Sequence, residues 1–211
     1  MSEKEIGLNL KRVAIFLILA ILWPAMSFAA SPISVVFFEN HNCYQIEGCF
    51  SISANRYVIW KVLTNYNHIS DFVQNMKFSH VKIQKGNNLL LEQNAVEGFL
   101  FFTKTIRVLL DVHEVPEKFI YFRDVNYKDF KFYQGYWAIK SAGASKQVFY
   151  SLAAQANFSA PAFLSGGIAE GSVLQLLKSV RKEILVQQTI SEKKTIETVS
   201  MMPIHTQLKK K

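Results

Sequence analysis

The chain has 211 residues, half of them hydrophobic, and it carries a formal net charge of +8. This length suits one domain with a substantial core. A positive charge of this size can attract nucleic acid or anionic membrane surfaces. The basic residues are scattered, however, except for two clusters, Lys178, Arg181 and Lys182, and Lys209 to Lys211.

The N-terminal segment 1–29 has the layout of a secretory signal peptide. A basic flank with Lys11 and Arg12 precedes an apolar run, Val13 to Trp23, and small residues at Ser27 and Ala29 suit a cut after Ala29. A transmembrane anchor is the alternative, but it needs about 20 apolar residues, roughly twice the length of this run. We therefore expect a periplasmic or secreted protein with a net charge of +7 after cleavage. We expect no nucleic-acid partner, whereas contact with a membrane surface stays open.

Residues 30–44 are interpreted as a lead-in to the first strand, which the alternation of apolar and polar residues places at Gln45 to Ala54. The two cysteines, Cys43 and Cys49, are candidates for a disulfide, since such bonds persist outside the cytoplasm. Along one strand they would lie about 20 Å apart, whereas bridged Cα atoms lie within about 7 Å. A bridge therefore requires a chain reversal near Glu47 and Gly48, and both alternatives stay open.

Two short helices and six further strands follow in the predicted order. Asn55 is a suitable N-cap for a helix over Arg56 to Thr64, and a shorter helical turn is expected over His68 to Val73. Runs of apolar and β-branched residues bounded by turn residues then predict strands. These strands are Lys77 to Gln84, Asn88 to Asn94, Phe99 to His113, Lys118 to Val125, Phe130 to Lys140 and Gln147 to Asn157.

Short connections predict antiparallel pairing, and the alternation makes one face of the sheet apolar throughout. A helix over Ile168 to Gln188 carries an apolar stripe and is long enough, at about 30 Å, to cover that face. Residues 189–211 lack clear periodicity and end in lysines, so we interpret them as a loose basic tail. The segregation of strands from the long helix predicts an α+β fold with about seven strands.

Several strings, in this order and spacing, resemble the START-like (SRPBCC, helix-grip) superfamily, in particular its polyketide cyclase/dehydrase and coenzyme-Q-binding-like branch. The strings are Ile52 to Asn55, Trp60 to Tyr66, Asp71 to Val73, Asp129 to Phe132, Gly135 to Trp137, Tyr150 to Leu152 and Val180 to Ile184. The resemblance covers about residues 45–188, and it departs from the expected pattern at Asn65 and Lys128, both at element ends.

The resemblance implies an apolar cavity between the curved sheet and the C-terminal helix, in which family members hold lipids, quinones or polyketides. Glu92 is a candidate polar anchor if it points inward, although an outward orientation beside Leu91 suits the alternation better. The side chains expected to line the cavity are Leu110, Phe122, Trp137, Tyr150, Leu152, Val173, Leu177 and Val180.

Catalytic motifs are not evident in the sequence. The five histidines are scattered without metal-ligand spacing, and we expect no metal and no cofactor. The first functional hypothesis is a binding or carrier protein for a hydrophobic small molecule or lipid. The alternative is a cyclase/dehydrase- or hydrolase-type enzyme that uses Glu92 or Tyr150. A third, weaker hypothesis is a membrane-surface module that acts through the basic tail.

Overall fold

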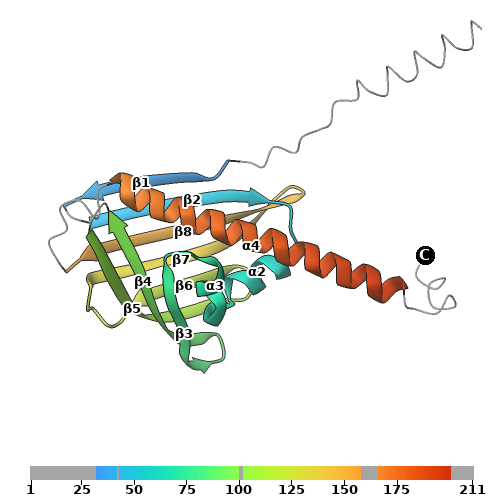
Figure 1. Ribbon diagram of the computed structural model, residues 1–211, viewed down its shortest axis with the longest axis horizontal. Helices are drawn as coiled ribbons and strands as arrows, with labels where there is room; N and C mark the ends of the chain where they lie inside the picture. Colours follow the sequence, from blue (N-terminus) through green and yellow to red (C-terminus); the bar gives the residue numbers. More distant parts are fainter. Residues whose placement is uncertain (1–31, 42, 100–101, 158–165, 201–211) are drawn as a thin grey trace, which may run out of the picture. The chain divides into compact units, whose positions relative to one another are not determined.

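A computed structural model describes residues 32–41, 43–99, 102–157 and 166–200. Its described strands form one eight-stranded antiparallel sheet in the order β1-β2-β8-β7-β6-β5-β4-β3 (Figure 1). The strands are β1 (Ser34–Asn40), β2 (Cys43–Ile52), β3 (Met76–Lys85), β4 (Asn88–Phe99), β5 (Phe102–Val115), β6 (Phe119–Asp124), β7 (Phe130–Ala142) and β8 (Ser145–Ala156). The predicted α+β class and the antiparallel pairing are therefore confirmed.

Strand β1 lies within residues 30–44, which the sequence interpretation took for a lead-in, and it is the eighth strand of a sheet predicted to have about seven. It pairs with β2 from Ser34 opposite Cys49 to Asn40 opposite Cys43. Val35 and Phe37 pack against the core, whereas Val36 and Phe38 are exposed. An edge strand buries little of its surface, so its alternation is a weak signal.

Strand β4 extends further than the sequence suggested. The predicted strand ended at Asn94, before Gly98, but Gly98 pairs with Thr103 inside the ladder, and Phe99 pairs with Phe102. Phe99 therefore ends β4 instead of starting the next strand. A strand register set by many cross-strand pairs overrides one local glycine signal.

The short helices lie close to their predicted positions. Helix α2 (Arg56–Leu63) begins at Asn55, whose side chain accepts a 2.8 Å hydrogen bond from the backbone N–H of Tyr57. The 3₁₀ helix η1 (Tyr66–His68) and α3 (Ile69–Phe72) follow. The apolar stripe of α2, which includes the fully buried Ile59, joins the core.

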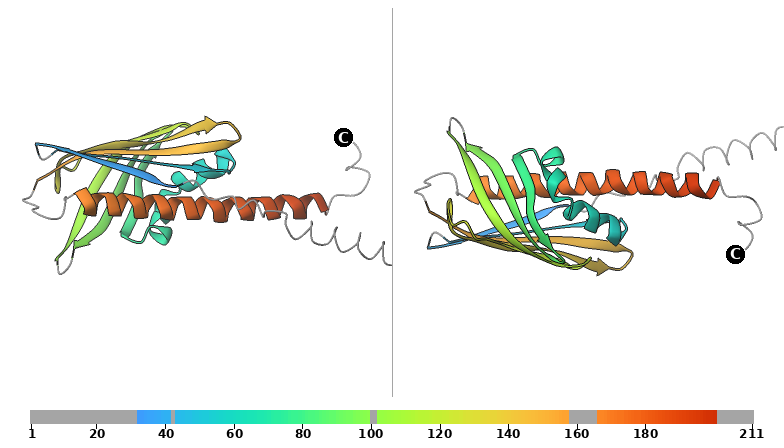
Figure 2. Two further views of the ribbon diagram at one scale, coloured as in Figure 1. Left: turned by 90° about the horizontal axis from the view of Figure 1, so that it is seen from above. Right: turned by 90° about the horizontal axis from the view of Figure 1, so that it is seen from below.

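Helix α4 (Gly166–Ser200) lies along the concave face of the sheet, and its C-terminal end projects beyond the strands (Figures 1 and 2). Its buried stripe is Ala169, Val173, Leu177, Val180 and Ile184. Leu185, next to Ile184, lies outside this stripe and is 47% exposed. None of the described helices is long and apolar enough to cross a membrane.

The helical end of α4 corrects the prediction that the chain becomes a loose tail at Thr189. Residues 189–200 continue the helix although they bury almost nothing. Intrahelical side-chain contacts support them, such as the 2.7 Å hydrogen bond from Gln188 to Glu192. Helix formation does not require an apolar stripe, so the lack of periodicity did not show that residues 189–200 are helical. Lys209 to Lys211 and the predicted signal peptide lie outside the described residues.

The faces of the strands agree with the predicted alternation. Val108, Leu110 and Val112 of β5 are buried on the concave face, while Asp111 lies on the convex face. Asp111 forms a 2.8 Å ion pair with Arg123 of β6. The core therefore lies between the concave face and the helices.

A disulfide between Cys43 and Cys49 is not formed. Both thiols are free, and β2 runs through Glu47 and Gly48 without reversing. The continuous pairing of this segment with both β1 and β8 keeps it extended. The separation of about 20 Å along a strand therefore excludes a bridge within this fold.

Candidate ligand cavity

Two adjoining chambers lie between the concave face of the sheet and the N-terminal half of α4. The outer chamber, of about 180 Å³, includes Tyr44, Leu152 and Ser172 in its wall. The inner chamber, of about 110 Å³, includes Leu110, Trp137 and Val180. The two chambers share part of their wall. Five side chains line both, namely Val73, Met76, Tyr133, Tyr150 and Leu176.

Aromatic rings form much of the wall that the sheet provides. Trp137 and Tyr150, opposite each other on β7 and β8, have ring centroids 4.6 Å apart. Phe122 of β6 stacks on Tyr150 at 6.2 Å and contacts Tyr133 at 6.0 Å. These rings come from three neighbouring strands, so they form one continuous aromatic surface facing α4.

The polar groups at the end of the inner chamber are already paired within the protein. The hydroxyl of Tyr66 donates a 2.7 Å hydrogen bond to Glu114. Burial, together with this hydrogen bond, raises the pKa of Tyr66 far above its usual value. The amide of Gln93 donates a 3.0 Å hydrogen bond to the buried hydroxyl of Ser79. The inner chamber therefore presents mainly apolar and aromatic surface.

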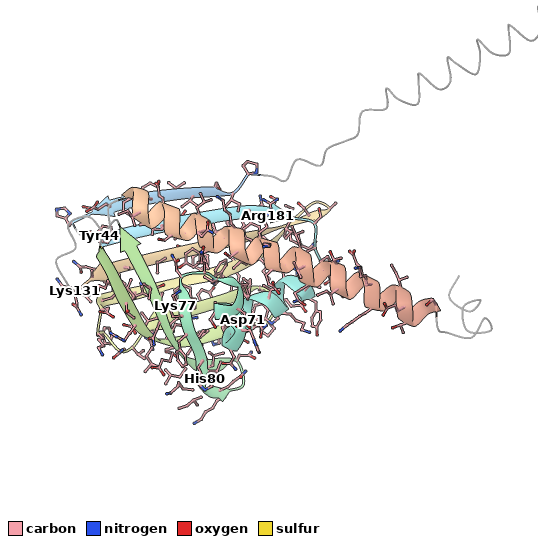
Figure 3. The ribbon with its side chains drawn as sticks, in the orientation of Figure 1. Tyr44, Asp71, Lys77, His80, Lys131 and Arg181 are labelled. Atoms are coloured by element: carbon pink, nitrogen blue, oxygen red, sulfur yellow. The ribbon has the colours of Figure 1, made fainter. Side chains whose placement is uncertain are left out.

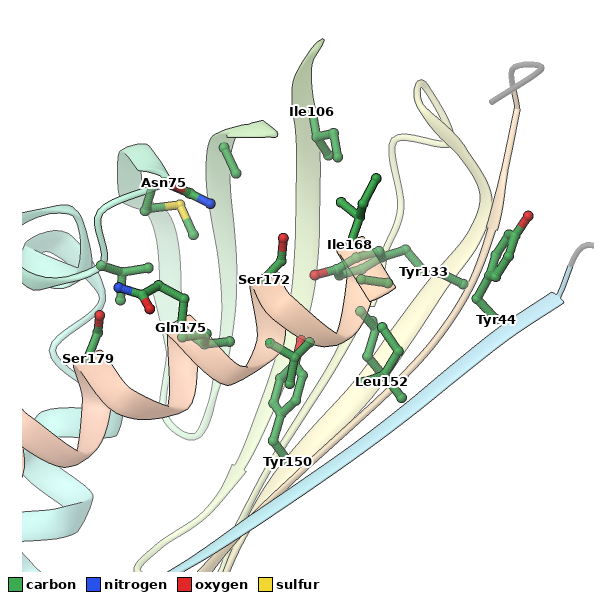
Figure 4. Close-up of a pocket in the computed structure, with 18 of the residues that line it drawn as sticks. Tyr44, Asn75, Ile106, Tyr133, Tyr150, Leu152, Ile168, Ser172, Gln175 and Ser179 are labelled. Carbon is green, nitrogen blue, oxygen red and sulfur yellow. The ribbon is translucent and has the colours of Figure 1, made fainter. Parts of the chain in front are cut away.

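The outer chamber has a polar rim. Figure 4 shows Asn75 opposite α4, where Ser172, Gln175 and Ser179 stand on the helix at successive turns. Gln175 and Gln74 are exposed, whereas all the described side chains of the inner chamber are buried or half-buried. The rim therefore offers neutral amide and hydroxyl groups next to solvent.

Charged side chains are absent from the described walls of both chambers. Their titratable groups are the tyrosine hydroxyls of Tyr44, Tyr66, Tyr133 and Tyr150. Burial, reinforced by the nearby Glu39 carboxylate, raises the pKa of Tyr44. The hydroxyls of Tyr44 and Tyr66 therefore stay neutral at physiological pH.

Seven of the eight side chains expected to line a cavity do so. Leu110, Phe122, Trp137 and Val180 lie in the inner chamber, Leu152 and Val173 in the outer chamber, and Tyr150 in both. Leu177 is the exception, because it is fully buried against Gly48 of β2 and reaches neither chamber.

Glu92 does not serve as an inward anchor. It lies on the opposite face of β4 from the buried Leu91 and forms a 3.1 Å ion pair with Lys82 of β3. Its side chain is 38% exposed. The alternation along β4 explains this orientation.

The sequence interpretation missed the residues that follow α3, namely Gln74, Asn75 and Met76, and it missed Tyr133. Gln74 and Asn75 lie between two elements, so no periodicity indicates where they point. Tyr133 lies four residues before Trp137 on β7 and on the same face, so the alternation along this strand could have identified it.

Metal-ligating side chains do not gather anywhere in the described ranges, where no group of three or more His, Cys, Asp or Glu could hold an ion. His68 of η1 pairs with Asp71 of α3 at 2.9 Å on the surface. Figure 3 shows that His80 on β3 lies apart from Asp71. The amides of Asn75 and Gln175 and the hydroxyl of Ser179 are polar groups at the chamber wall that a bound molecule could contact.

The sequence matches no protein-family model and no curated protein. Solved structures of similar fold nevertheless exist. A STAR-related lipid transfer protein from Xanthomonas axonopodis superposes with a TM-score of 0.59 at 13% identity, covering 72% of this chain and 93% of that one. An aromatase/cyclase from Streptomyces sp. R1128 gives 0.56 at 13% identity, covering 67% and 93%. A START superfamily protein from Mycobacterium smegmatis gives 0.53 at 11% identity, covering 66% and 96%.

These similarities establish the helix-grip fold that START/SRPBCC proteins share. At such low identity they do not establish an activity, because one fold serves many functions.

Proposed function

We propose that this protein binds an apolar small molecule in the two chambers and acts as an exported binding or carrier protein. The observation that carries the proposal is the composition of the chamber walls. They combine an aromatic surface from Phe122, Trp137 and Tyr150 with aliphatic side chains from α4. Concave sites lined mainly by apolar groups, with a few polar groups at one side, are typical of small-molecule sites.

The similar structures support this proposal at the level of fold. One of them is described as a lipid transfer protein and another as an aromatase/cyclase. The first description names a lipid as the molecule transferred, whereas the second names only an activity. We carry over only the apolar character of the bound molecule.

Catalysis in the same chambers is the alternative function, as a cyclase/dehydrase- or hydrolase-type enzyme. Two residues were considered for it. Glu92 is paired with Lys82 on the convex face, so of the two only Tyr150 lies in the chamber walls. The described walls hold no carboxylate, imidazole or amine that could act with it. Binding without catalysis therefore accounts for the site with fewer assumptions.

Mass spectrometry of the purified protein tests the binding function. The protein would be isolated from its native compartment, extracted with organic solvent and compared with two tryptophan variants. Ile106→Trp places a large ring in the outer chamber, whereas Arg107→Trp places the same ring on the convex face. We expect an extractable apolar compound with wild type and Arg107→Trp, and much less with Ile106→Trp. Equal recovery from all three proteins would contradict the proposal.

Export is a separate part of the proposal and has its own test. The basic flank, the apolar run from Val13 to Trp23 and Ala29 support cleavage of residues 1–29. Intact mass measurement of the protein should then give a chain that begins at Ala30. Recovery of a chain that retains residues 1–29 in the cytoplasmic fraction would contradict export without affecting the binding function. Contact of Lys209 to Lys211 with a membrane surface stays a prediction.

A further inference from the structure

We infer that the bound molecule is uncharged and compact, with one or two rings in the inner chamber and a carbonyl or hydroxyl group at the rim of the outer chamber. This inference rests on the proposed binding function and narrows it to a class of ligand. Four features of the chambers lead to it: their neutrality, their size, the location of their polar groups and their aromatic wall.

Neutrality follows from the described walls, which contain no Asp, Glu, Lys, Arg or His side chain. An ionised carboxylate or phosphate inside them would lose its hydration without gaining a counter-ion. Moving an isolated charge into an apolar environment is strongly unfavourable, so such groups are normally paired with an opposite charge. The positive net charge of the chain does not change this, because no lysine or arginine of the described residues lies in the chamber walls.

Size limits the ligand in a second way. The chambers have volumes of about 180 and 110 Å³. Sites that bury drug-sized ligands have volumes of about 300–1,000 Å³, so the two chambers together reach only the lower end of that range. A two-chain phospholipid cannot be enclosed in this space, whereas one or two fused rings can.

The polar groups set the orientation of the ligand. In the inner chamber, the Tyr66 hydroxyl is committed to Glu114 and the Gln93 amide is bonded to Ser79. At the rim, the amides of Asn75 and Gln175 and the hydroxyl of Ser179 face the outer chamber (Figure 4). A carbonyl or hydroxyl group of the ligand can therefore form hydrogen bonds with neutral groups at the rim, next to solvent.

The aromatic wall favours a ring over a flexible chain. Trp137, Tyr150 and Phe122 form contacts at 4.6 and 6.2 Å and present a continuous surface to the inner chamber. Aromatic pairs prefer offset-stacked or edge-to-face contacts. Each such contact contributes binding free energy in addition to that of burying apolar surface. A rigid ring also loses less conformational entropy on binding than an acyl chain.

Calorimetric titration of the mature chain with matched probes tests this inference. 2-Naphthol and 2-naphthoate share one ring system but differ in charge at pH 7.5, and palmitate and phosphatidylcholine vesicles represent chain lipids. We expect 2-naphthol to bind at least tenfold more tightly than 2-naphthoate and than either lipid. Gln175→Ala should weaken 2-naphthol binding about fivefold through one lost hydrogen bond, whereas Lys178→Ala on an exposed part of α4 should not.

A charge placed at the rim provides a gain-of-function test. Ser179→Lys should reverse the preference and make 2-naphthoate the tighter ligand, whereas Ser179→Met, of similar length but neutral, should not.

If wild type binds 2-naphthoate as tightly as 2-naphthol, the neutral class is wrong and the binding function stands. If palmitate or phosphatidylcholine binds most tightly, the compact class is wrong. If no probe binds and the purified protein carries no apolar compound, the binding function itself fails.

Discussion

Leu177 of α4 packs directly against the backbone of Gly48 in β2, in the space that a Cβ of residue 48 would occupy. Leu177 is fully buried and has little room to move. The absence of a side chain at Gly48 therefore lets the helix approach this part of the sheet closely. Further across the sheet, α4 stands over the two chambers. The chambers thus begin where this close contact ends.

A larger side chain at Gly48 should destabilise the domain. In Gly48→Val the added methyl groups would overlap Leu177, and overpacking of a core costs about 1–3 kcal/mol. Gly171→Ala is the matched control, because a Cβ at this exposed position of α4 meets no atom within 4 Å. Alanine there should raise stability by up to about 1 kcal/mol through helix propensity. Urea unfolding of the three proteins measures both effects, and an unchanged midpoint for Gly48→Val would contradict the close packing.

The Tyr66–Glu114 hydrogen bond should make stability depend on pH in the alkaline range. Because the pKa of Tyr66 is raised in the folded state, the unfolded chain loses this proton first. The contribution of Tyr66 is therefore complete below the unfolded pKa of about 10 and decreases as the pH rises above it. Unfolding free energies at pH 8 and pH 11 should show this loss in wild type. The loss should be smaller in Tyr66→Phe, and equal losses in both proteins would argue against it.

Asp124 should be a major contributor to stability among the carboxylates. It is 2% exposed and accepts hydrogen bonds from the backbone N–H groups of Leu109, Asn126 and Tyr127 at 2.9–3.1 Å. Asp124→Ala would leave buried donors without an acceptor and should cost about 3 kcal/mol. Asp111→Ala is the control, since its exposed pair with Arg123 is worth about 0–1 kcal/mol. Chemical denaturation should separate the two variants clearly, and similar values would contradict the role of Asp124.

Both cysteines should remain reduced in the exported protein. Titration with a thiol reagent in denaturant, without reductant, should find two thiols per chain and one in Cys49→Ser. Burial raises the pKa of the Cys49 thiol, an effect that Lys140 only partly opposes. Cys49 should therefore react slowly in the native protein at neutral pH. A mass 2 Da below that of the reduced chain would indicate a bridge and contradict the extended β2.

Most of the fold could be predicted because its patterns are local. The buried residues Val108, Leu110 and Val112 follow from a period of two, and Val173, Val180 and Ile184 from a helical stripe. The errors lie where burial is weak. Edge strand β1 and residues 189–200 of α4 bury too little surface to produce a clear pattern.

The cavity could be predicted only in part. Seven lining residues were identified because they lie on the apolar faces of strands and helix. Leu177 and Val180 belong to the same helical stripe, yet Leu177 contacts Gly48 whereas Val180 faces a chamber. Asn75 and Met76 line the outer chamber because the segment after α3 lies beside α4, a contact between residues about a hundred positions apart.

The sequence by itself determined which faces of the strands and of α4 are apolar, and hence that the helix covers the sheet, because side-chain periodicity is a local property. Only the tertiary structure decided that this cover leaves two neutral chambers, how large they are and which polar groups surround their rim. Those properties depend on how far α4 stands from the sheet. That separation is set by long-range contacts such as Leu177 on Gly48 and by the bulk of the aromatic wall.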